Sequence, residues 1–286
     1  MAVGLDQDAR RDVARPASWS QIGNEPIVTA LMYHDIVAAG AEDASGFAGR
    51  DAALYKITPE QFDHHLGAIA ESQRASGRSS DVVFTFDDGG SSAMRAADAL
   101  DRRGLTGHFF VTANYIGARG FVTRADLLEL RRRGHRIGSH SCSHPLRMAH
   151  CEWSQLLDEW TRSRSLLSDI LCEDVRLASV PGGDFSPQVA RAAAGAGYIR
   201  LFTSEPTRQE QHAFGMTVTG RFAIQRWTSA ATAAGLAAGQ WRPCAQQAMV
   251  WKAKKLTKRL GGARYLKLRR LLIGHGNDVQ WGDRAP

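Results

Sequence analysis

The sequence has few features of an exported or membrane-spanning protein. It contains four cysteines and no CxxC pair, which argues against a zinc knuckle and against the disulfide framework of a small secreted protein. No run approaches the roughly 20 apolar residues that a membrane-spanning helix needs. The first residues are polar and charged and have no apolar core, so we expect no secretory signal peptide. These absences predict a soluble, cytoplasmic protein.

The composition is that of a folded protein with a positive net charge. Apolar residues make up 43% of the 286 and aromatic residues 8%, which is enough for a packed core. The net charge of +7 predicts an anionic partner or surface for part of the molecule. We divide the chain into a polar extension (residues 1–25), a main domain (26–240) and a basic amphipathic segment (241–286).

Predicted strands and helices alternate along the main domain. Short apolar runs predict strands at 27–33, 81–86, 106–113, 136–140, 175–183, 198–204 and 221–227. Amphipathic stretches between them predict helices at 58–72, 91–104, 123–134, 153–171 and 186–197. This order favours parallel strands with right-handed crossovers, and therefore an α/β barrel or a doubly wound sheet.

Side chains of catalytic type fall where these strands end. In parallel α/β folds, functional groups gather at the carboxyl ends of the strands. We therefore expect one face of the sheet to carry His34, Asp87, Asp88, His140, the loop at Pro181, and Arg226.

The adjacent carboxylates of Asp87 and Asp88 predict a bound cation, because neighbouring acids repel each other unless a cation or a proton lies between them. His140 and His144 are four residues apart and can converge on one divalent ion. If these histidines and one aspartate held a metal, the other aspartate would remain free as a general base. Either motif alone is more typical of a surface or a helix cap, but the two together favour a metal site.

Three motifs follow one another in the main domain. The stretch "TFDDG" is followed about fifty residues later by "HSCSHP", and "SVPGGDFSP" comes after both. The segments "LMYHDI", "YKITPEQFDHHL" and "GHFFVT" accompany them. This combination resembles the polysaccharide deacetylases, carbohydrate esterase family 4, in the branch with a strand before the acid motif. The resemblance spans about residues 27–227 and implies an incomplete, distorted (β/α) barrel.

The resemblance implies a role for each matched residue. Asp87 would be the general base, and Asp88, His140 and His144 would bind one divalent metal ion. Zinc is the expected ion, and the same ligands also suit cobalt, nickel or iron. The implied reaction hydrolyses the amide of an N-acetylated sugar and releases acetate.

The resemblance also implies substrate contacts. A backbone N–H near Tyr115 is expected to stabilise the oxyanion. Pro181 and Gly182, in the third motif, are expected to line the substrate groove.

The sequence departs from the family pattern at two supporting positions. Ser179 stands where the family usually has an arginine that pins the base, and the acidic partner motif of that arginine is not recognisable. The late histidine motif has only an echo in "LIGHGND", at His275. Arg226 is a candidate to pair with Asp87 instead, or is a solvated charge at a strand end. His34 is a candidate general acid, or is a histidine bonded within the sheet.

The segment 251–272, "WKAKKLTKRLGGARYLKLRRLL", is basic and amphipathic. Such a segment favours peripheral contact with an anionic membrane at its cytoplasmic face, and a terminal helix docked by its leucines would have the same pattern. Nothing in the sequence resembles a nucleic-acid-binding module, so no nucleic-acid partner is expected.

The leading interpretation is a metal-dependent N-deacetylase acting on a glycoside, a nucleotide sugar or a lipid-linked glycan precursor. A hydrolase of a non-glycan C–N amide bond on the same scaffold is one alternative. A carbohydrate-binding pseudoenzyme is another, suggested by the missing arginine and the missing acid motif, although retention of Asp87, Asp88, His140 and His144 weighs against it.

Overall fold

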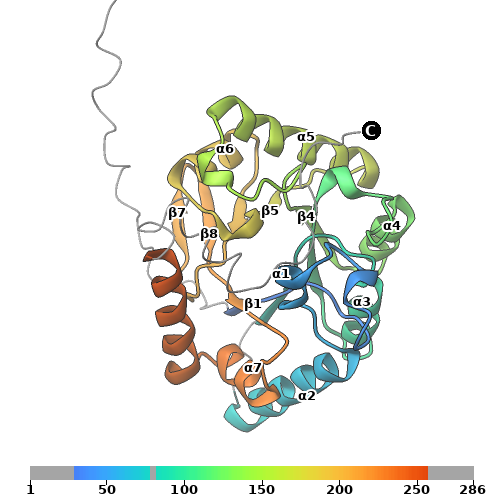
Figure 1. Cartoon of the computed structure of the whole chain (residues 1–286), viewed down its shortest axis with the longest axis vertical. Helices are drawn as coiled ribbons and strands as arrows, with labels where there is room; N and C mark the ends of the chain where they lie inside the picture. The colour runs from blue at the N-terminus through green and yellow to red at the C-terminus, as the bar shows by residue number, and fades with distance from the viewer. Residues whose placement is uncertain (1–28, 78–81, 257–286) are drawn as a thin grey trace, which may run out of the picture.

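The computed structural model describes residues 29–77 and 82–256 and shows a curled sheet with helices around it (Figure 1). Nine strands pair in the order β7-β8-β6-β5-β4-β3-β2-β1-β9. Their bounds are β1 Thr29–Tyr33, β2 Val82–Phe86, β3 Gly107–Val111, β4 Arg136–Ser139, β5 Leu177–Ser179, β6 Arg200–Phe202, β7 Gln211–Ala213, β8 Met216–Thr219 and β9 Phe222–Ala223. Within the described residues β7 and β9 do not pair, so the barrel is incomplete. The predicted fold class is confirmed.

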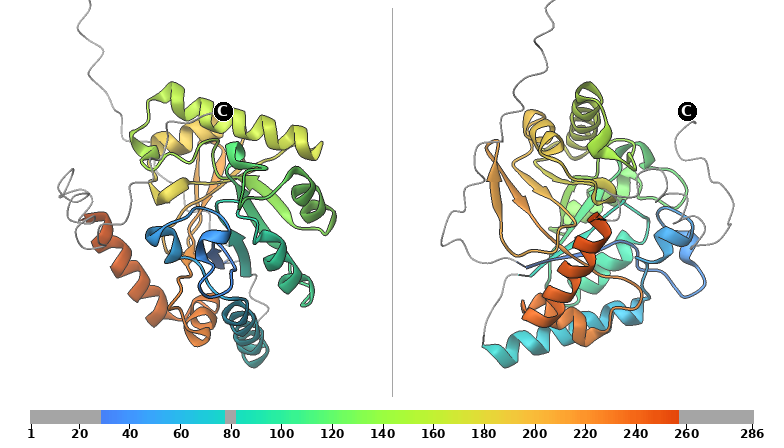
Figure 2. Two further views of the ribbon diagram at one scale, coloured as in Figure 1. Left: turned by 45° about the vertical axis from the view of Figure 1, so that its right-hand side comes forward. Right: turned by 60° about the vertical axis from the view of Figure 1, so that its left-hand side comes forward.

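The helices surround the sheet, apart from α1, which lies in front of the middle of the sheet in the view of Figure 1 (Figures 1 and 2). They are α1 Arg50–Ala53, α2 Pro59–Ser76, α3 Ala93–Asp101, α4 Arg124–Arg132, α5 Trp153–Leu171, α6 Pro187–Gly195 and α7 Ala230–Ala237. Residues 241–256 are also helical. In the described part of the chain, none of the helices has the length and apolar character needed to cross a membrane.

Local sequence signals explain where these helices begin. The Thr58 side chain accepts a hydrogen bond from the Gln61 N–H, and the Gln61 side chain accepts one from the Thr58 N–H. This capping box satisfies backbone donors that the first helical turn leaves free, and Pro59 supplies a helical φ. Ser186 caps α6 in the same way. Both starts agree with the sequence prediction.

The strands position the site because their register is fixed by packing. Every residue of β1 is buried. Tyr33 pairs with Phe86, and Phe86 pairs with Phe109, against whose ring it stacks at a centroid distance of 4.8 Å. His34, which follows Tyr33, and Asp87, which follows Phe86, therefore emerge from the carboxyl edge of the sheet at one level.

Two features at the C-terminal side of the sheet differ from the prediction. The strand expected at 221–227 is reduced to Phe222–Ala223, and 226–227 form a turn. The β7–β8 hairpin, antiparallel and closed by positive φ at Phe214 and Gly215, was not predicted. Its strands have only three and four residues, too few to show a clear apolar alternation.

Candidate active site

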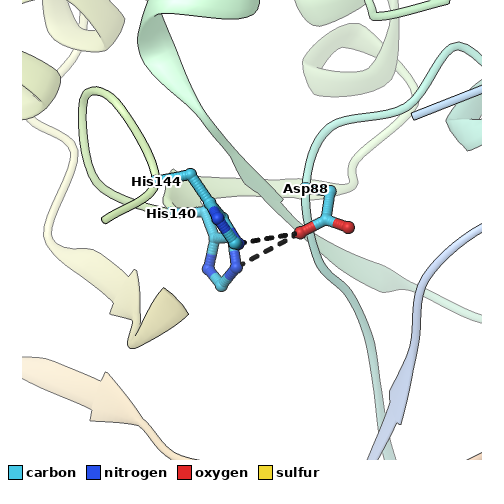
Figure 3. Close-up of side chains that lie close together, drawn as sticks. All are labelled: Asp88, His140 and His144. Carbon is cyan, nitrogen blue, oxygen red and sulfur yellow. Dashed lines mark ion pairs between the residues drawn. The ribbon is translucent and has the colours of Figure 1, made fainter. Parts of the chain in front are cut away.

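Asp88, His140 and His144 form one cluster at the carboxyl edge of the sheet (Figure 3). One carboxylate oxygen of Asp88 lies 3.4 Å from Nε2 of His140 and 3.5 Å from Nε2 of His144. The three ligand atoms lie within 4.8 Å of one another. The predicted ligands therefore converge.

The hydrogen bonding of His140 indicates that a cation belongs in this cluster. Nδ1 of His140 lies 3.1 Å from the Ser179 carbonyl oxygen, which can only accept, so Nδ1 carries the proton. In the neutral ring, Nε2 then presents a lone pair to the Asp88 carboxylate, and two such groups repel unless a cation lies between them. Ligands about 2.1 Å from a tetrahedral ion are about 3.4 Å apart, close to the separations observed. The donor set fits a divalent metal.

The pKa of Asp88 agrees with a ligand that stays ionised. Burial raises the pKa of this carboxyl, but the nearby His140 and His144 side chains more than offset that effect. The pKa is therefore held well below its ordinary value. The carboxylate is available to a metal across the physiological range.

A buried carboxylate holds the loop between the two histidines. Ser141 and His144 both have positive φ, 65° and 61°, a strained conformation for residues other than glycine. Glu159 of α5 is 6% exposed and accepts hydrogen bonds from the N–H groups of Cys142 and Ser143, at 2.9 and 2.8 Å. It also accepts one from the Ser143 hydroxyl at 2.5 Å. Cys142 thus acts as more than a spacer, because its backbone N–H anchors the loop.

Asp87 is paired with an arginine that sequence reasoning missed. Arg221 donates to both carboxylate oxygens of Asp87, at 2.7 Å each, and its side chain is fully buried. Its remaining donors go to the Thr85 and Ser179 hydroxyls and the Thr203 carbonyl. All five donors of the guanidinium are therefore satisfied.

This ion pair keeps Asp87 ionised. Burial raises the pKa of the Asp87 carboxyl, but the positive charge of Arg221 and its hydrogen bonds outweigh burial. The pKa is thus held below its ordinary value. Asp87 is fixed in orientation as well as in charge.

The prediction that Arg226 pairs with Asp87 is wrong. Arg226 lies in the turn after β9, its side chain is 51% exposed, and its partner is Glu42 at 3.8 Å. Because β9 is only two residues long, the arginine that enters the barrel is the one before the strand. The small Ser179 side chain leaves room for that guanidinium and bonds to it.

His34 lies level with Asp87. The Asp87 N–H donates to the Tyr33 carbonyl, so His34 follows β1 at the same level as Asp87 follows β2. His34 is close enough to lower the pKa of both Asp87 and Asp88. Its Nδ1 is buried and has no hydrogen-bond partner among the described residues, and its ring lies 4.7 Å from that of Tyr55. The position suits the predicted general acid, whose role stays a prediction.

The neighbouring Asp35 serves the structure of a loop. Its Oδ1 accepts hydrogen bonds from the Ser45 and Ser92 hydroxyls, at 2.6 and 2.7 Å. Lys56 lies 3.6 Å from Oδ2 and donates to the Ser45 and Phe47 carbonyls. This network places the Phe47 ring 4.7 Å from that of the ligand His144.

The expected oxyanion donor near Tyr115 is already engaged. The Tyr115 N–H donates to the Thr112 carbonyl at 3.0 Å. The N–H groups of residues 113, 114 and 116–118 also donate to backbone carbonyls. This contradicts the prediction of a free donor in that loop.

The Pro181 loop, Pro181–Gly183, directly follows Ser179, whose carbonyl accepts from His140. Pro181 is buried, and Gly182 has φ of 59° and lies against the Leu146 carbonyl just after His144. The loop thus borders the metal cluster, and its contact with substrate stays a prediction. His275 and most of the basic segment lie outside the described residues.

Comparisons with known proteins agree with this geometry. Residues 74–200 match the polysaccharide deacetylase family model. They include the base and all three predicted ligands. The resemblance to polysaccharide deacetylases is confirmed.

One curated relative supports the same assignment over part of its length. YxkH of Bacillus subtilis, a predicted polysaccharide deacetylase, is 27% identical over 126 residues. That segment covers 44% of this chain and 45% of the relative. The alignment therefore covers less than half of each protein.

Solved structures share the fold. A polysaccharide deacetylase from Bacillus cereus superposes with a TM-score of 0.60 at 17% identity, over 73% of this chain and 68% of that one. IcaB from Ammonifex degensii gives 0.60 at 19% identity, over 73% and 97% of the two chains. The Streptococcus pyogenes deacetylase PplD, solved with acetate, gives 0.55 at 20%, over 71% and 94%. At these identities the superpositions establish the fold alone.

Proposed function

We propose that this protein is a metal-dependent N-deacetylase that releases acetate from an N-acetylated sugar. The observation that carries the proposal is the pairing of two differently held carboxylates at one edge of the sheet. Asp88 lies against two histidine nitrogens, and Asp87 is oriented by Arg221. The substrate would be a glycoside, a nucleotide sugar or a lipid-linked glycan precursor, and a cytoplasmic location stays a prediction.

Asp88, His140 and His144 would hold the ion, with zinc the expected metal. When bound, a divalent ion supplies Lewis-acid polarisation of the acetamide carbonyl and lowers the pKa of water. Asp87 would accept the proton of the attacking water. Its fixed orientation and its lowered pKa keep it unprotonated and ready for this role.

His34 would donate a proton to the leaving amine. An amide nitrogen is expelled poorly as an anion, so a proton donor near neutral pKa assists this step. The level position of His34 beside Asp87 and its unpartnered Nδ1 support the assignment. His34 thereby takes the place of the family's late histidine motif.

The alternatives differ in how well they account for the site. The pseudoenzyme hypothesis was motivated by a missing arginine and a missing acid motif. Arg221 removes the first ground because it holds Asp87 by two hydrogen bonds, and the second depends on the proposed role of His34. A hydrolase of a non-glycan amide would use the same residues. Only the substrate separates it from a sugar deacetylase.

Acetate release from a panel of N-acetylated sugars, glycosides and nucleotide sugars, with and without added metal, tests the proposal. A parallel panel of non-glycan acetamides addresses the alternative. Metal-dependent release from at least one sugar is expected, with none from Asp87→Asn. Release confined to the non-glycan panel would overturn the sugar assignment. If no compound releases acetate while the metal site is fully occupied, the proposal that the protein is an enzyme is wrong.

A further inference from the structure

The helix 241–256 is attached to the barrel by one face only. The Gln247 side-chain amide donates to the Ala223 carbonyl and accepts from the Ala223 N–H, both at 2.9 Å. It thus pairs with β9, the last strand of the sheet order. Cys244, on the same face, packs against the main core. The outer face of the helix points away from the sheet (Figure 2).

That outer face carries large apolar side chains in water. Trp241 is 73% exposed, Met249 65% and Leu256 55%. They are separated by eight and seven residues, so they form a single stripe along the helix. We call Trp241, Met249 and Leu256 the apolar stripe. Among the large apolar side chains of the described residues, Trp241 and Met249 are the two most exposed.

The stripe is bordered by positive charge. Arg242, Lys252, Lys254 and Lys255 are all exposed on the same helix. The sequence has no aspartate or glutamate from 211 to 277, and it has 12 lysines and arginines there. The rest of the chain then holds 24 of the 36 basic residues against all 29 acidic ones, a net charge of −5. The positive charge of this protein is therefore concentrated at one end of the chain.

We propose that the helix 241–256 docks on an anionic lipid surface, with the apolar stripe in the headgroup region and the lysines against the lipid charges. This interaction surface is separate from the proposed deacetylase site. An amphipathic helix of this kind binds by apolar burial and electrostatic attraction together. A nucleic acid would be attracted by the charge but would gain nothing from Met249 and Leu256. A second copy of the chain would bring like charges together.

Flotation of the full chain with phosphatidylcholine vesicles, with and without phosphatidylglycerol, tests the proposal. We expect binding only when phosphatidylglycerol is present, and weaker binding as salt is raised. Lys252→Gln with Lys255→Gln should lower the partition coefficient by about 30-fold, given a contribution of about 1 kcal/mol from each basic residue at such a surface. Trp241→Ser, Met249→Ser and Leu256→Ser together should abolish binding.

Matched variants elsewhere on the surface control for charge and hydrophobicity. Arg119→Gln with Arg124→Gln removes the same charge from exposed positions, and Leu128→Ser with Leu166→Ser removes exposed apolar side chains. These variants should bind vesicles like the unchanged protein.

Several results would overturn the proposal. They are absence of binding at low salt, equal loss in the control variants, or equal binding to neutral vesicles. If stripe variants instead dissociate a dimer in sedimentation equilibrium while vesicle binding is unchanged, the stripe is a self-association surface. Acetate release from a soluble substrate, measured on the same samples, shows whether the catalytic assignment holds independently of vesicle binding.

Discussion

The two halves of the site are held by different kinds of support. On the metal side, His140 and His144 come from one five-residue stretch, and Glu159 of the next long helix anchors the loop between them. On the base side, Asp87 depends on Arg221, 134 residues further along the chain. The metal side is thus built by local chain geometry, and the base side by the curvature of the whole sheet. The experiments below disturb one side while the other is observed.

Removal of His34, the proposed proton donor on the base side, should have a large effect. His34→Ala is expected to slow turnover of an amide substrate by about 10²–10⁴-fold, because the leaving amine would no longer receive a proton. An activated aryl ester, whose leaving group needs no proton, should be affected far less. Equal losses on both substrates would assign His34 to another role and return attention to His275.

Arg221→Met should lower the free energy of unfolding and should also leave Asp87 without the partner that orients it. Removing one partner of a buried ion pair typically costs about 3–5 kcal/mol, since the other charge remains buried and uncompensated. Urea denaturation measures the loss, and metal binding by the variant should persist under native conditions.

A double variant checks the cause. Arg221→Met combined with Asp87→Asn removes both charges, so it should be less destabilised than the sum of the two single variants. If the effects simply add, the stabilisation by Arg221 does not act through Asp87. Arg226→Met is the matched control and should be near neutral, because its side chain is half exposed and its partner lies 3.8 Å away.

Glu159→Gln should weaken the metal side alone. Both backbone N–H groups donate to Oε2 of Glu159, so the Gln amide oxygen can keep these two bonds, but the negative charge and the acceptor at Oε1 for the Ser143 hydroxyl are lost, which loosens the loop that carries both histidines. Changes to such supporting partners typically cost 10–100-fold in metal affinity. Titration with cobalt, followed by its visible absorption, measures the affinity and the ligand geometry together. An unchanged affinity and spectrum would limit Glu159 to a role in folding.

The smallest expected effect is a pH dependence of stability that arises at His108, outside both halves of the site. Burial, with Arg136 and Arg200 nearby, lowers the pKa of His108 to about 4 from its ordinary value of 6.5. The unfolded chain therefore takes up the proton first as pH falls. The stabilisation is complete above pH 6.5 and is lost progressively as pH falls to about 4.

His108→Gln should remove this part of the pH dependence. Urea midpoints above pH 6.5 and near pH 4 would differ less in the variant than in the unchanged protein. An identical difference in both would show that His108 does not contribute.

The sequence was most informative where function depends on neighbouring residues. "TFDDG" and "HSCSHP" predicted the ligand cluster because register between adjacent parallel strands brings their ends together. The capping box at Thr58 predicted a helix start for the same local reason. His34 could be placed because β1 pairs directly with β2.

The base-side arginine could not be found by the same reasoning. Arg221 precedes a strand of two residues and reaches across the barrel to β2 and β5, so its role depends on how far the sheet curls. The expectation that functional side chains lie at the carboxyl ends of strands pointed to Arg226 instead. The Tyr115 prediction failed because an N–H seen in sequence gives no sign of whether a turn already uses it.

The central claim is that Asp87 and Asp88 have separate roles, and metal content measured beside acetate release tests it most directly. Asp87→Asn should retain one bound divalent ion while turnover falls by about 10²–10⁴-fold. Asp88→Asn should lose both the ion and the activity. Metal loss in Asp87→Asn, or a fully loaded Asp88→Asn, would contradict the account.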